Sequence, residues 1–201
     1  MQTRNWMQNK KKVAKWAADL VESKEGFIVV DTETTGTGPQ DEVVQIGVVE
    51  YMQGEVNVLL ECLVRPLKVV ISPAASDITG ITMDTVRHAP FINAYREVLE
   101  YIFHNRRLIA YNADFDERLL RQSFNATGHP FPFEIECAML AYAKFYGEWN
   151  DYRGDYRWQK LVAACKQQNI PVVDAHRAAG DCIMTCKVME AMGEAHYVRP
   201  K

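Results

Sequence analysis

Ten residues near the start of the chain, FIVVDTETTG from Phe27 to Gly36, constrain the fold most strongly. Four apolar residues lead into Asp31, and Glu33 follows two positions later. Residues i and i+2 of an extended strand lie on the same face, so the pattern predicts two carboxylates side by side at the end of a buried strand. Like charges this close repel each other, and burying each of them is costly. A compensating positive charge is therefore expected beside them.

Length and charge bound the class of protein. A chain of 201 residues, 48% of them hydrophobic, can form one domain with a sizeable core and an added helix. The net charge of −3 does not by itself indicate a nucleic-acid-binding protein, although a cluster of acidic residues in one site would lower the total. No run of apolar residues is long enough for a membrane helix, so no membrane partner is expected.

The cysteines and the N-terminus bear on the compartment. The five cysteines contain no CxxC pair, which favours buried free thiols over a metal site or disulfides. Free thiols are typical of a reducing compartment, so we expect a cytoplasmic protein. The first twenty residues are basic, but no apolar segment follows them as in a signal peptide.

The N-terminal residues have the spacing of an amphipathic helix over 5–23, with apolar residues such as Trp6, Val13 and Trp16 on one face and lysines on the other. We expect this helix, within residues 1–25, to pack on the flank of a main domain of residues 26–195, with a short tail at 196–201. Contact with phosphates or with a protein partner is the alternative role of the helix.

The rest of the pattern predicts an α/β domain. The expected strands are 27–31, 42–51, 56–66 and 106–111, and the expected helices are 90–105, 113–124, 136–147, 159–169 and 175–193. Residues 71–82 are expected to form a loop with short helical turns, and residues 148–158 a polar, aromatic loop. The first three strands form an antiparallel meander, and a right-handed helical crossover places the fourth beside the first and parallel to it. A mixed sheet covered by helices on both faces follows.

Three acidic motifs lie at points that this topology brings together. Asp31 and Glu33 end the first strand, Asp114 and Asp116 follow the fourth, and Asp181 lies one turn into the last helix. The carboxyl ends of adjacent parallel strands form one edge of the sheet, where sites of open α/β sheets lie. No lysine or arginine directly adjoins any of these carboxylates in the sequence to neutralise it.

Divalent cations are the simplest compensating charge for such a cluster. Oxygen ligands with open water positions favour Mg²⁺ or Mn²⁺, and two such ions clamp a phosphodiester for in-line attack by water. His176, five residues before Asp181, is then a candidate general base. The alternatives are that Asp31 caps a turn, that one of Asp114 and Asp116 only begins a helix, and that His176 is an ordinary surface or core histidine.

These motifs resemble those of a known family. DTETTG, NADFD and HRAAGD are similar, in sequence and order, to the three motifs of the DEDDh 3′–5′ exonucleases, which include polymerase proofreading subunits, ribonuclease T and oligoribonuclease. The resemblance extends over residues 27–192 and implies a ribonuclease H-like fold with a mixed five-stranded sheet flanked by helices. The stretch 137–161 further resembles prophage- or plasmid-borne members.

The resemblance implies roles for individual residues. Asp31, Glu33, Asp116 and Asp181 match the ligands of two Mg²⁺ or Mn²⁺ ions, with Asp31 bridging both. Asp116 matches rather than Asp114 because it directly follows a phenylalanine, and His176 matches the histidine that deprotonates water. The resemblance also implies substrate contacts at Thr32, Thr34, Gly36, Thr79, Asn112 and Phe115.

Three positions depart from the family pattern, and none of them is a metal ligand. Thr37 stands where the family often has a large apolar residue, Thr79 where it often has the histidine of His-Gly-Ile, and Tyr111 where it often has histidine. The first two bear on how the terminal base and nucleotide are held, and therefore on substrate preference.

The sequence thus predicts a metal-dependent 3′–5′ exonuclease that releases nucleoside 5′-monophosphates from single-stranded or frayed DNA or RNA. The alternatives are an oligoribonuclease-like RNA-end trimmer and a non-catalytic nucleic-acid-binding or polymerase-tethering module. The expected partners are DNA or RNA 3′ ends and a DNA polymerase or another replication or repair protein.

A cluster of aromatic residues with two arginines suggests a nucleic-acid contact outside the three motifs. We expect either base stacking or ordinary packing from Tyr142, Tyr146, Trp149, Tyr152, Tyr156 and Trp158, with Arg153 and Arg157 among them.

Overall fold

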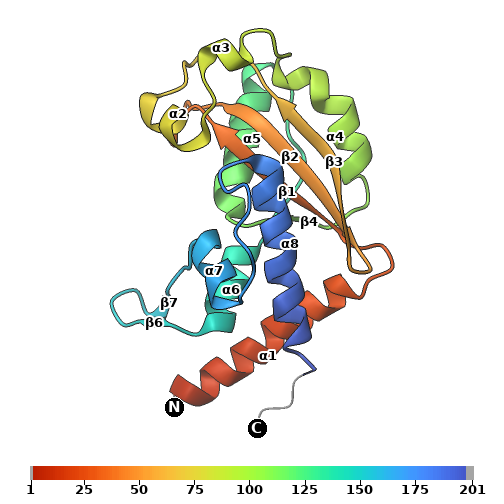
Figure 1. The fold of residues 1–201 in the computed structure, drawn as a ribbon, viewed down its shortest axis with the longest axis vertical. Coiled ribbons are helices and arrows are strands. Elements are labelled where there is room, and N and C mark those ends of the chain that lie inside the picture. Colours follow the sequence, from red (N-terminus) through yellow and green to blue (C-terminus); the bar gives the residue numbers. More distant parts are fainter. Residues whose placement is uncertain (1, 198–201) are drawn as a thin grey trace.

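A computed structural model describes the backbone of residues 2–197 and the side chains of residues 6–197. Its centre is a mixed five-stranded sheet in the order β3-β2-β1-β4-β5 (Figure 1). The strands are β1 (Phe27–Thr34), β2 (Val43–Met52), β3 (Glu55–Leu63), β4 (Leu108–Ala110) and β5 (Glu136–Cys137). The predicted fold class, an α/β sheet flanked by helices, is confirmed.

Strand β1 is buried on both sides because its apolar residues alternate between two cores. Phe27 and Val29 belong to one core, and Ile28 and Val30 belong to the other. A strand that is apolar at every position, as FIVV is, has this two-sided burial in α/β proteins. The polar residues that follow keep the same alternation, so Asp31 and Glu33 continue the face of Val29, and Thr32 continues the face of Val30.

Helices cover both faces of the sheet. Helices α1 (Gln2–Val21), α6 (Ala138–Tyr146), α7 (Leu161–Gln167) and α8 (Ala178–Glu194) contribute buried residues to the core with Phe27 and Val29. Helices α4 (Arg96–Phe103) and α5 (Ala113–Ala126) contribute to the core with Ile28 and Val30. Asp31 and Glu33 therefore lie on the α8 side of the sheet, and Thr32 lies on the α5 side.

The pairing of β1 confirms the predicted topology. It is antiparallel to β2, where Asp31 lies opposite Gly47, and parallel to β4, where Val29 lies opposite Ile109. The carboxyl ends of β1 and β4 therefore lie at one edge of the sheet, from which α5 begins.

Several predicted boundaries were wrong. The strand expected at 106–111 is only Leu108–Ala110, because Asn105 has a φ of +57° and Arg106 N–H bonds Phe103 O in a turn. The helix expected from 136 begins at Ala138, because residues 136–137 pair with β4 as strand β5. The last helix begins at Ala178, so His176 precedes it.

Short elements occupy two segments expected to be loops. Residues 71–82, expected as a loop with short helical turns, contain α2 (Pro73–Thr79), and α3 (Met83–Val86) follows. The segment expected as helix 90–105 begins with the 3₁₀ turn η1 (Ile92–Tyr95), and α4 follows it. Residues 148–158 contain a small hairpin of β6 (Trp149–Asn150) and β7 (Asp155–Tyr156).

The remaining expectations concern the chain ends and the thiols. The helix expected at 5–23 is present as α1, which packs against α8 and α6. Of the tail expected at 196–201, residues 198–201 lie outside the described residues. All five cysteines are free thiols, and Cys165, Cys182 and Cys186 are buried. In the part of the chain that the structure describes, no helix is long and apolar enough to cross a membrane.

Candidate active site

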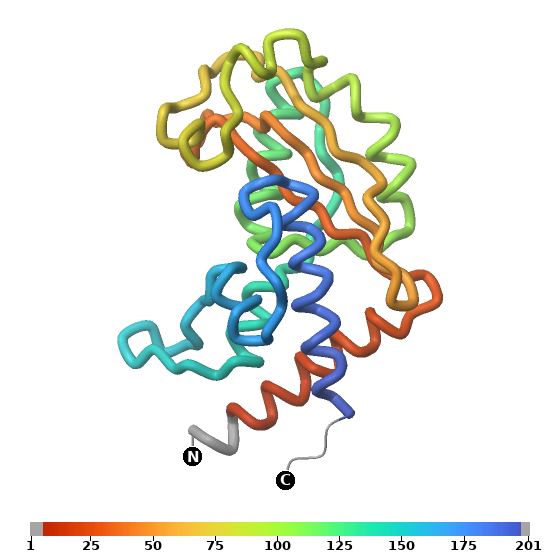
Figure 2. The backbone as a smooth tube through the Cα atoms, in the orientation of Figure 1, coloured from red at the N-terminus to blue at the C-terminus, as the bar shows by residue number. Residues whose placement is uncertain are grey.

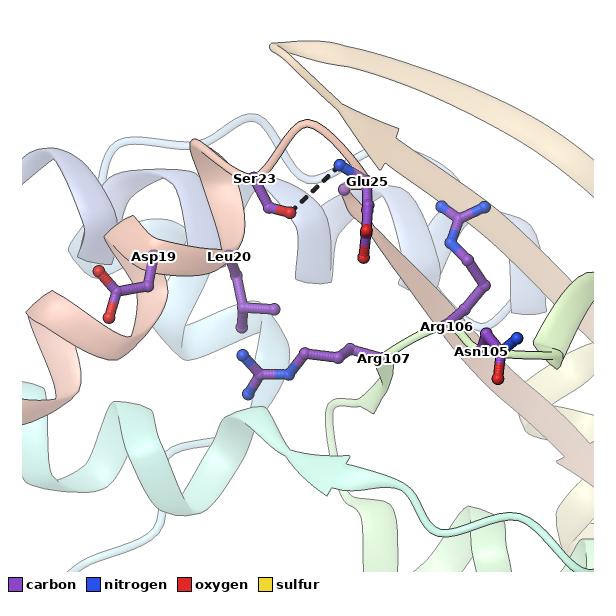
Figure 3. Close-up of a pocket in the computed structure, with 8 residues that line it drawn as sticks. Asp19, Leu20, Ser23, Glu25, Asn105, Arg106 and Arg107 are labelled. Atoms are coloured by element: carbon purple, nitrogen blue, oxygen red, sulfur yellow. Dashed lines mark hydrogen bonds between the residues drawn. The ribbon is translucent and has the colours of Figure 1, made fainter.

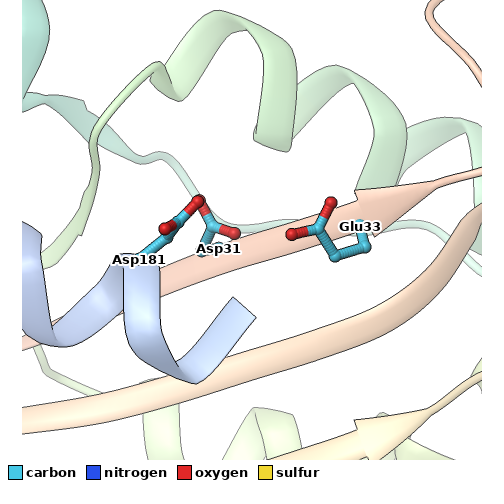
Figure 4. A group of neighbouring side chains, drawn as sticks. All are labelled: Asp31, Glu33 and Asp181. Atoms are coloured by element: carbon cyan, nitrogen blue, oxygen red, sulfur yellow. The ribbon is translucent and has the colours of Figure 1, made fainter. Parts of the chain in front are cut away.

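Three carboxylates meet between β1 and α8. Asp31, Glu33 and Asp181 each offer an oxygen, and these oxygens lie within 4.8 Å of one another. Figure 4 shows the two β1 side chains and that of Asp181, from the start of α8, pointing toward one another. All three residues are half-buried, which leaves the cluster open to solvent and to a ligand.

Asp116, in the first turn of α5, lies near this cluster and acts on it electrostatically, but its oxygens are not among those within 4.8 Å of one another. It is 3% exposed, and its Oδ1 accepts hydrogen bonds from Thr32 N at 3.0 Å and from Thr32 Oγ1 at 2.8 Å. Thr32 thereby holds Asp116 beside β1, and its hydroxyl is committed to that bond. Asp114, two positions earlier in the same turn, is exposed. Asn112, rather than either aspartate, is the N-cap residue of α5.

The four carboxylates carry an excess of negative charge. Burial, followed by the charges of Asp116, Asp181 and Glu33, raises the pKa of Asp31 well above its ordinary value. Burial and then Asp181 and Asp116 raise the pKa of Glu33 to about 7. Burial also raises the pKa of Asp116, against the opposing hydrogen bonds from Thr32, and that of Asp181.

No basic side chain supplies the missing positive charge. Among the ion pairs of residues 6–197, none involves any of these four carboxylates. Carboxylate oxygens that converge without a lysine or arginine are the donor set that Mg²⁺ and Mn²⁺ prefer. The residues present therefore fit a divalent-ion site, as the sequence predicted.

The raised pKa of Glu33 predicts that the folding stability of the metal-free protein depends on pH. Between its ordinary value of 4.5 and about 7, the unfolded chain ionises Glu33 while the folded protein does not, so folding stability falls as pH rises. We expect metal-free Glu33→Gln to melt a few degrees above the metal-free natural protein at pH 8 and at the same temperature near pH 4.5. Thermal melting in a chelator tests this. A natural protein that is the more stable of the two at pH 8 would contradict it.

His176 reaches the cluster through its backbone. Its N–H donates to Asp181 Oδ1 at 3.3 Å, and its imidazole is exposed in the segment before α8. Its φ of +66° is uncommon outside glycine, and Asp174 nearby has a φ of +50°. Such backbone conformations persist where the surrounding structure fixes them, and they are concentrated at functional sites.

Gly47 is a site residue that the sequence analysis missed. It lies on β2 opposite Asp31, and a Cβ there would clash with the backbone of Ala178 and Ala179. The start of α8 can therefore approach the sheet only because residue 47 has no side chain, and this approach carries Asp181 to the cluster. A glycine inside an apolar strand is a signal for such close approach of another backbone.

We expect Gly47→Ala to displace the start of α8 and to lower kcat by about 10²-fold, the scale of a small misplacement of reacting groups. Gly193→Ala is the matched control, because it adds a methyl group to the far end of the same helix, at 3.2 Å from Ala18. That variant should lose stability without a comparable loss of kcat. Full activity of Gly47→Ala would remove residue 47 from the site.

The other predicted substrate contacts lie in the loop after β1, at the end of α2 and at the start of α5. Asn112 is exposed and Phe115 is half-buried, both at the start of α5 beside Asp116. The Thr34 hydroxyl donates to Gly36 O at 2.7 Å, and that of Thr79 donates to Ala75 O at 2.9 Å. Both threonine hydroxyls are thus engaged within the protein, in the loop after β1 and at the end of α2.

A hollow lies at the end of the sheet opposite the carboxylates, where β1 and β4 begin. It has a volume of about 80 Å³ and is lined by Asp19, Leu20, Ser23, Glu25, Gly26, Asn105, Arg106 and Arg107 (Figure 3). Its arginines are not available charges, because Arg106 pairs with Glu50 at 2.9 Å and Arg107 pairs with Glu136 at 2.6 Å. This hollow is therefore separate from the acidic site and lacks an unpaired cation for a phosphate.

The sheet order and the acidic cluster at its edge define a nuclease of ribonuclease H-like fold. The sequence matches the family model RNase_T, described as Exonuclease, over residues 28–189. The chain belongs to this exonuclease family and is a 3′–5′ exonuclease of the DEDDh type.

Relatives of known sequence and structure agree with this assignment. The exonuclease CP81 of Escherichia phage 186 is 34% identical over 175 residues, covering 83% of this chain and 88% of the phage protein. A PolC-type DNA polymerase III of Oceanobacillus iheyensis is 29% identical over 160 residues, which cover 79% of this chain and only 11% of the polymerase. Exonuclease X, solved with 5′ overhanging duplex DNA, is 27% identical with a TM-score of 0.65, covering 86% of this chain and 94% of that one.

Proposed function

We propose that this protein removes nucleotides one at a time from the 3′ ends of single-stranded or frayed DNA and releases nucleoside 5′-monophosphates. The observation that carries the proposal is the convergence of Asp31, Glu33 and Asp181 within 4.8 Å, with Asp116 beside them and no lysine or arginine ion-paired to them among the side chains of residues 6–197. DNA is favoured over RNA because the similar Exonuclease X was solved with a DNA duplex that has a 5′ overhang.

The four carboxylates would hold two Mg²⁺ or Mn²⁺ ions. When bound, the ions supply the positive charge that stabilises the transition state of an in-line phosphodiester displacement. Thr32 fixes Asp116 through two hydrogen bonds. Gly47, which has no side chain, lets the helix that carries Asp181 pack close to the sheet. The His176 imidazole takes the proton of the attacking water as the water oxygen bonds to phosphorus. The bond between phosphorus and the 3′ oxygen breaks, and that oxygen takes a proton from solvent, so the shortened strand keeps a 3′ hydroxyl.

The contacts to the terminal nucleotide belong to the same proposal. Asn112 and Phe115 flank the carboxylates at the start of α5, and Gly36 and Thr34 line the loop after β1. Thr79 is tied to this loop indirectly, because Ser72 N, just before α2, donates to Thr35 O at 2.9 Å. We propose that these residues hold the terminal base and sugar.

The test is a degradation assay with Mg²⁺ or Mn²⁺ on 5′-labelled single-stranded DNA, duplex DNA and RNA of matched sequence. We expect a ladder of products shortened from the 3′ end, fastest on single-stranded DNA. Faster degradation of short RNA would favour an oligoribonuclease-like trimmer. Binding without turnover on every substrate would favour a nucleic-acid-binding or polymerase-tethering module, a role that the partial match to PolC-type polymerases suggests.

We also propose the cytoplasm as the compartment and a replication or repair protein, such as a DNA polymerase, as a partner. The five free thiols suit a reducing compartment, and the relatives include PolC-type polymerases.

A further inference from the structure

We propose that the β6–β7 hairpin carries a second nucleotide-binding subsite, which takes a base and phosphate of the single strand on the 5′ side of the scissile bond. This inference rests on the proposed function, because it assigns the path of the same substrate strand. Figure 2 shows residues 148–157 as a loop that projects from the body of the molecule beside α6 and α7.

The structure divides the aromatic residues of this region into two groups. Tyr142 and Tyr156 are buried, so ordinary packing accounts for them. Tyr152 and Trp158 are 98% and 53% exposed. Tyr156 anchors the hairpin, because its hydroxyl accepts a hydrogen bond from Asn9 Nδ2 of α1 at 3.3 Å. Exposed aromatic rings on an anchored hairpin lose little freedom when a base stacks on them.

The hairpin also forms a hollow whose side chains are suited to binding a nucleotide. The hollow has a volume of about 300 Å³ and is lined by Asn150, Arg153, Tyr156, Arg157 and Trp158. The guanidinium of Arg153 lies 5.2 Å from the centre of the Trp158 ring. An aromatic face beside a guanidinium offers stacking to a base and paired N–H donors to a phosphate.

The two arginines of the hollow differ in their availability. Arg157 pairs with Glu148 at 3.0 Å. Arg153 has no carboxylate within 4.0 Å among the residues that the structure describes. Arg153 is therefore the cation left for a phosphate. Because the hairpin also contains Asp151 and Asp155, stacking on Trp158 rather than bulk positive charge has to supply most of the affinity.

The hollow is connected to the carboxylate edge of the sheet. The carbonyl of Gln159, the residue after Trp158, accepts a hydrogen bond from the Tyr111 hydroxyl at 2.8 Å. Tyr111 directly follows β4 and precedes the turn that begins α5 and carries Asp116. This hydrogen bond ties the chain beside the hollow to the segment that leads into Asp116, and in our proposal the substrate strand runs from the carboxylates toward the hairpin.

The length dependence of hydrolysis by the full chain tests the subsite. We expect Trp158→Ala to raise KM by about 10-fold on long single-stranded DNA, the scale of one lost stacking interaction, with kcat unchanged. On a trinucleotide, which by this proposal occupies only the carboxylate site, KM should be the same as in the natural protein. Trp158→Phe should restore most of the affinity. Arg153→Gln should show the same dependence of KM on substrate length, so the subsite can still be tested if Trp158→Ala disturbs the hairpin.

Tyr101→Ala is the matched control, since Tyr101 is 85% exposed on α4, on the other face of the sheet. If Trp158→Ala and Arg153→Gln both had the KM of the natural protein at every substrate length, the subsite would be overturned. The hairpin would then be left as a surface for a protein partner. A fall in kcat at every length, without the KM change, would also overturn it. Neither result touches the proposed function, which is tested separately by the products and rates of the natural protein on matched DNA and RNA.

Discussion

Asp31→Asn is expected to lower the rate of 3′-end hydrolysis by at least about 10³-fold, because metal-ion stabilisation of the transition state amounts to several kcal/mol. The amide has nearly the shape of the carboxylate, so folding should persist. The change removes one negative charge from the centre of the cluster, where Asp116, Asp181 and Glu33 all act on Asp31. The measurement is kcat on single-stranded DNA in Mn²⁺.

Asp114→Asn is the matched control for that experiment. Asp114 lies in the first turn of α5, two positions from Asp116, but it is exposed. The same chemical change there should leave kcat within a few-fold of the natural value. If Asp31→Asn retained full activity, or if both variants lost activity equally, the carboxylate cluster would not be the catalytic site.

His176→Ala is expected to reduce kcat by about 10²–10⁴-fold, the usual contribution of a general base. Its N–H, which donates to Asp181, survives the substitution, so the effect isolates the imidazole. Divalent-ion binding, followed by calorimetry, should be largely kept.

The backbone conformation of residue 176 calls for a second variant. At a φ of +66°, alanine is strained, whereas asparagine adopts this region more readily. His176→Asn should therefore show the same loss of kcat with a melting temperature closer to that of the natural protein. An unchanged rate in both variants would exclude His176 from the mechanism.

The sequence predicted the parts of the fold that local pattern determines. The apolar run FIVV indicated a buried strand, and the structure has this strand, with burial on both faces. Strand β5 was missed because its two residues carry no strand signal, and its existence depends on pairing with β4. The hairpin within 148–158 was missed because each strand has only two residues and lies in a polar segment.

The candidate site was predictable where the motifs name residues and unpredictable where it depends on contact between distant elements. The convergence of Asp31, Glu33 and Asp181 followed from strand ends and topology. The hydrogen bond from Thr32 to Asp116 links residues 84 positions apart in the sequence, and no local sequence pattern indicates it. The approach of α8 to Gly47 is likewise a packing relation between separate elements.

We infer that divalent ions balance the charge of these carboxylates. Anomalous X-ray diffraction from crystals of the protein soaked in Mn²⁺ tests it most directly. We predict two Mn²⁺ peaks among Asp31, Glu33, Asp116 and Asp181, with Asp31 oxygens contacting both. Crystals with no anomalous peak at these side chains at saturating Mn²⁺, or with a basic residue inserted among them instead, would contradict the account.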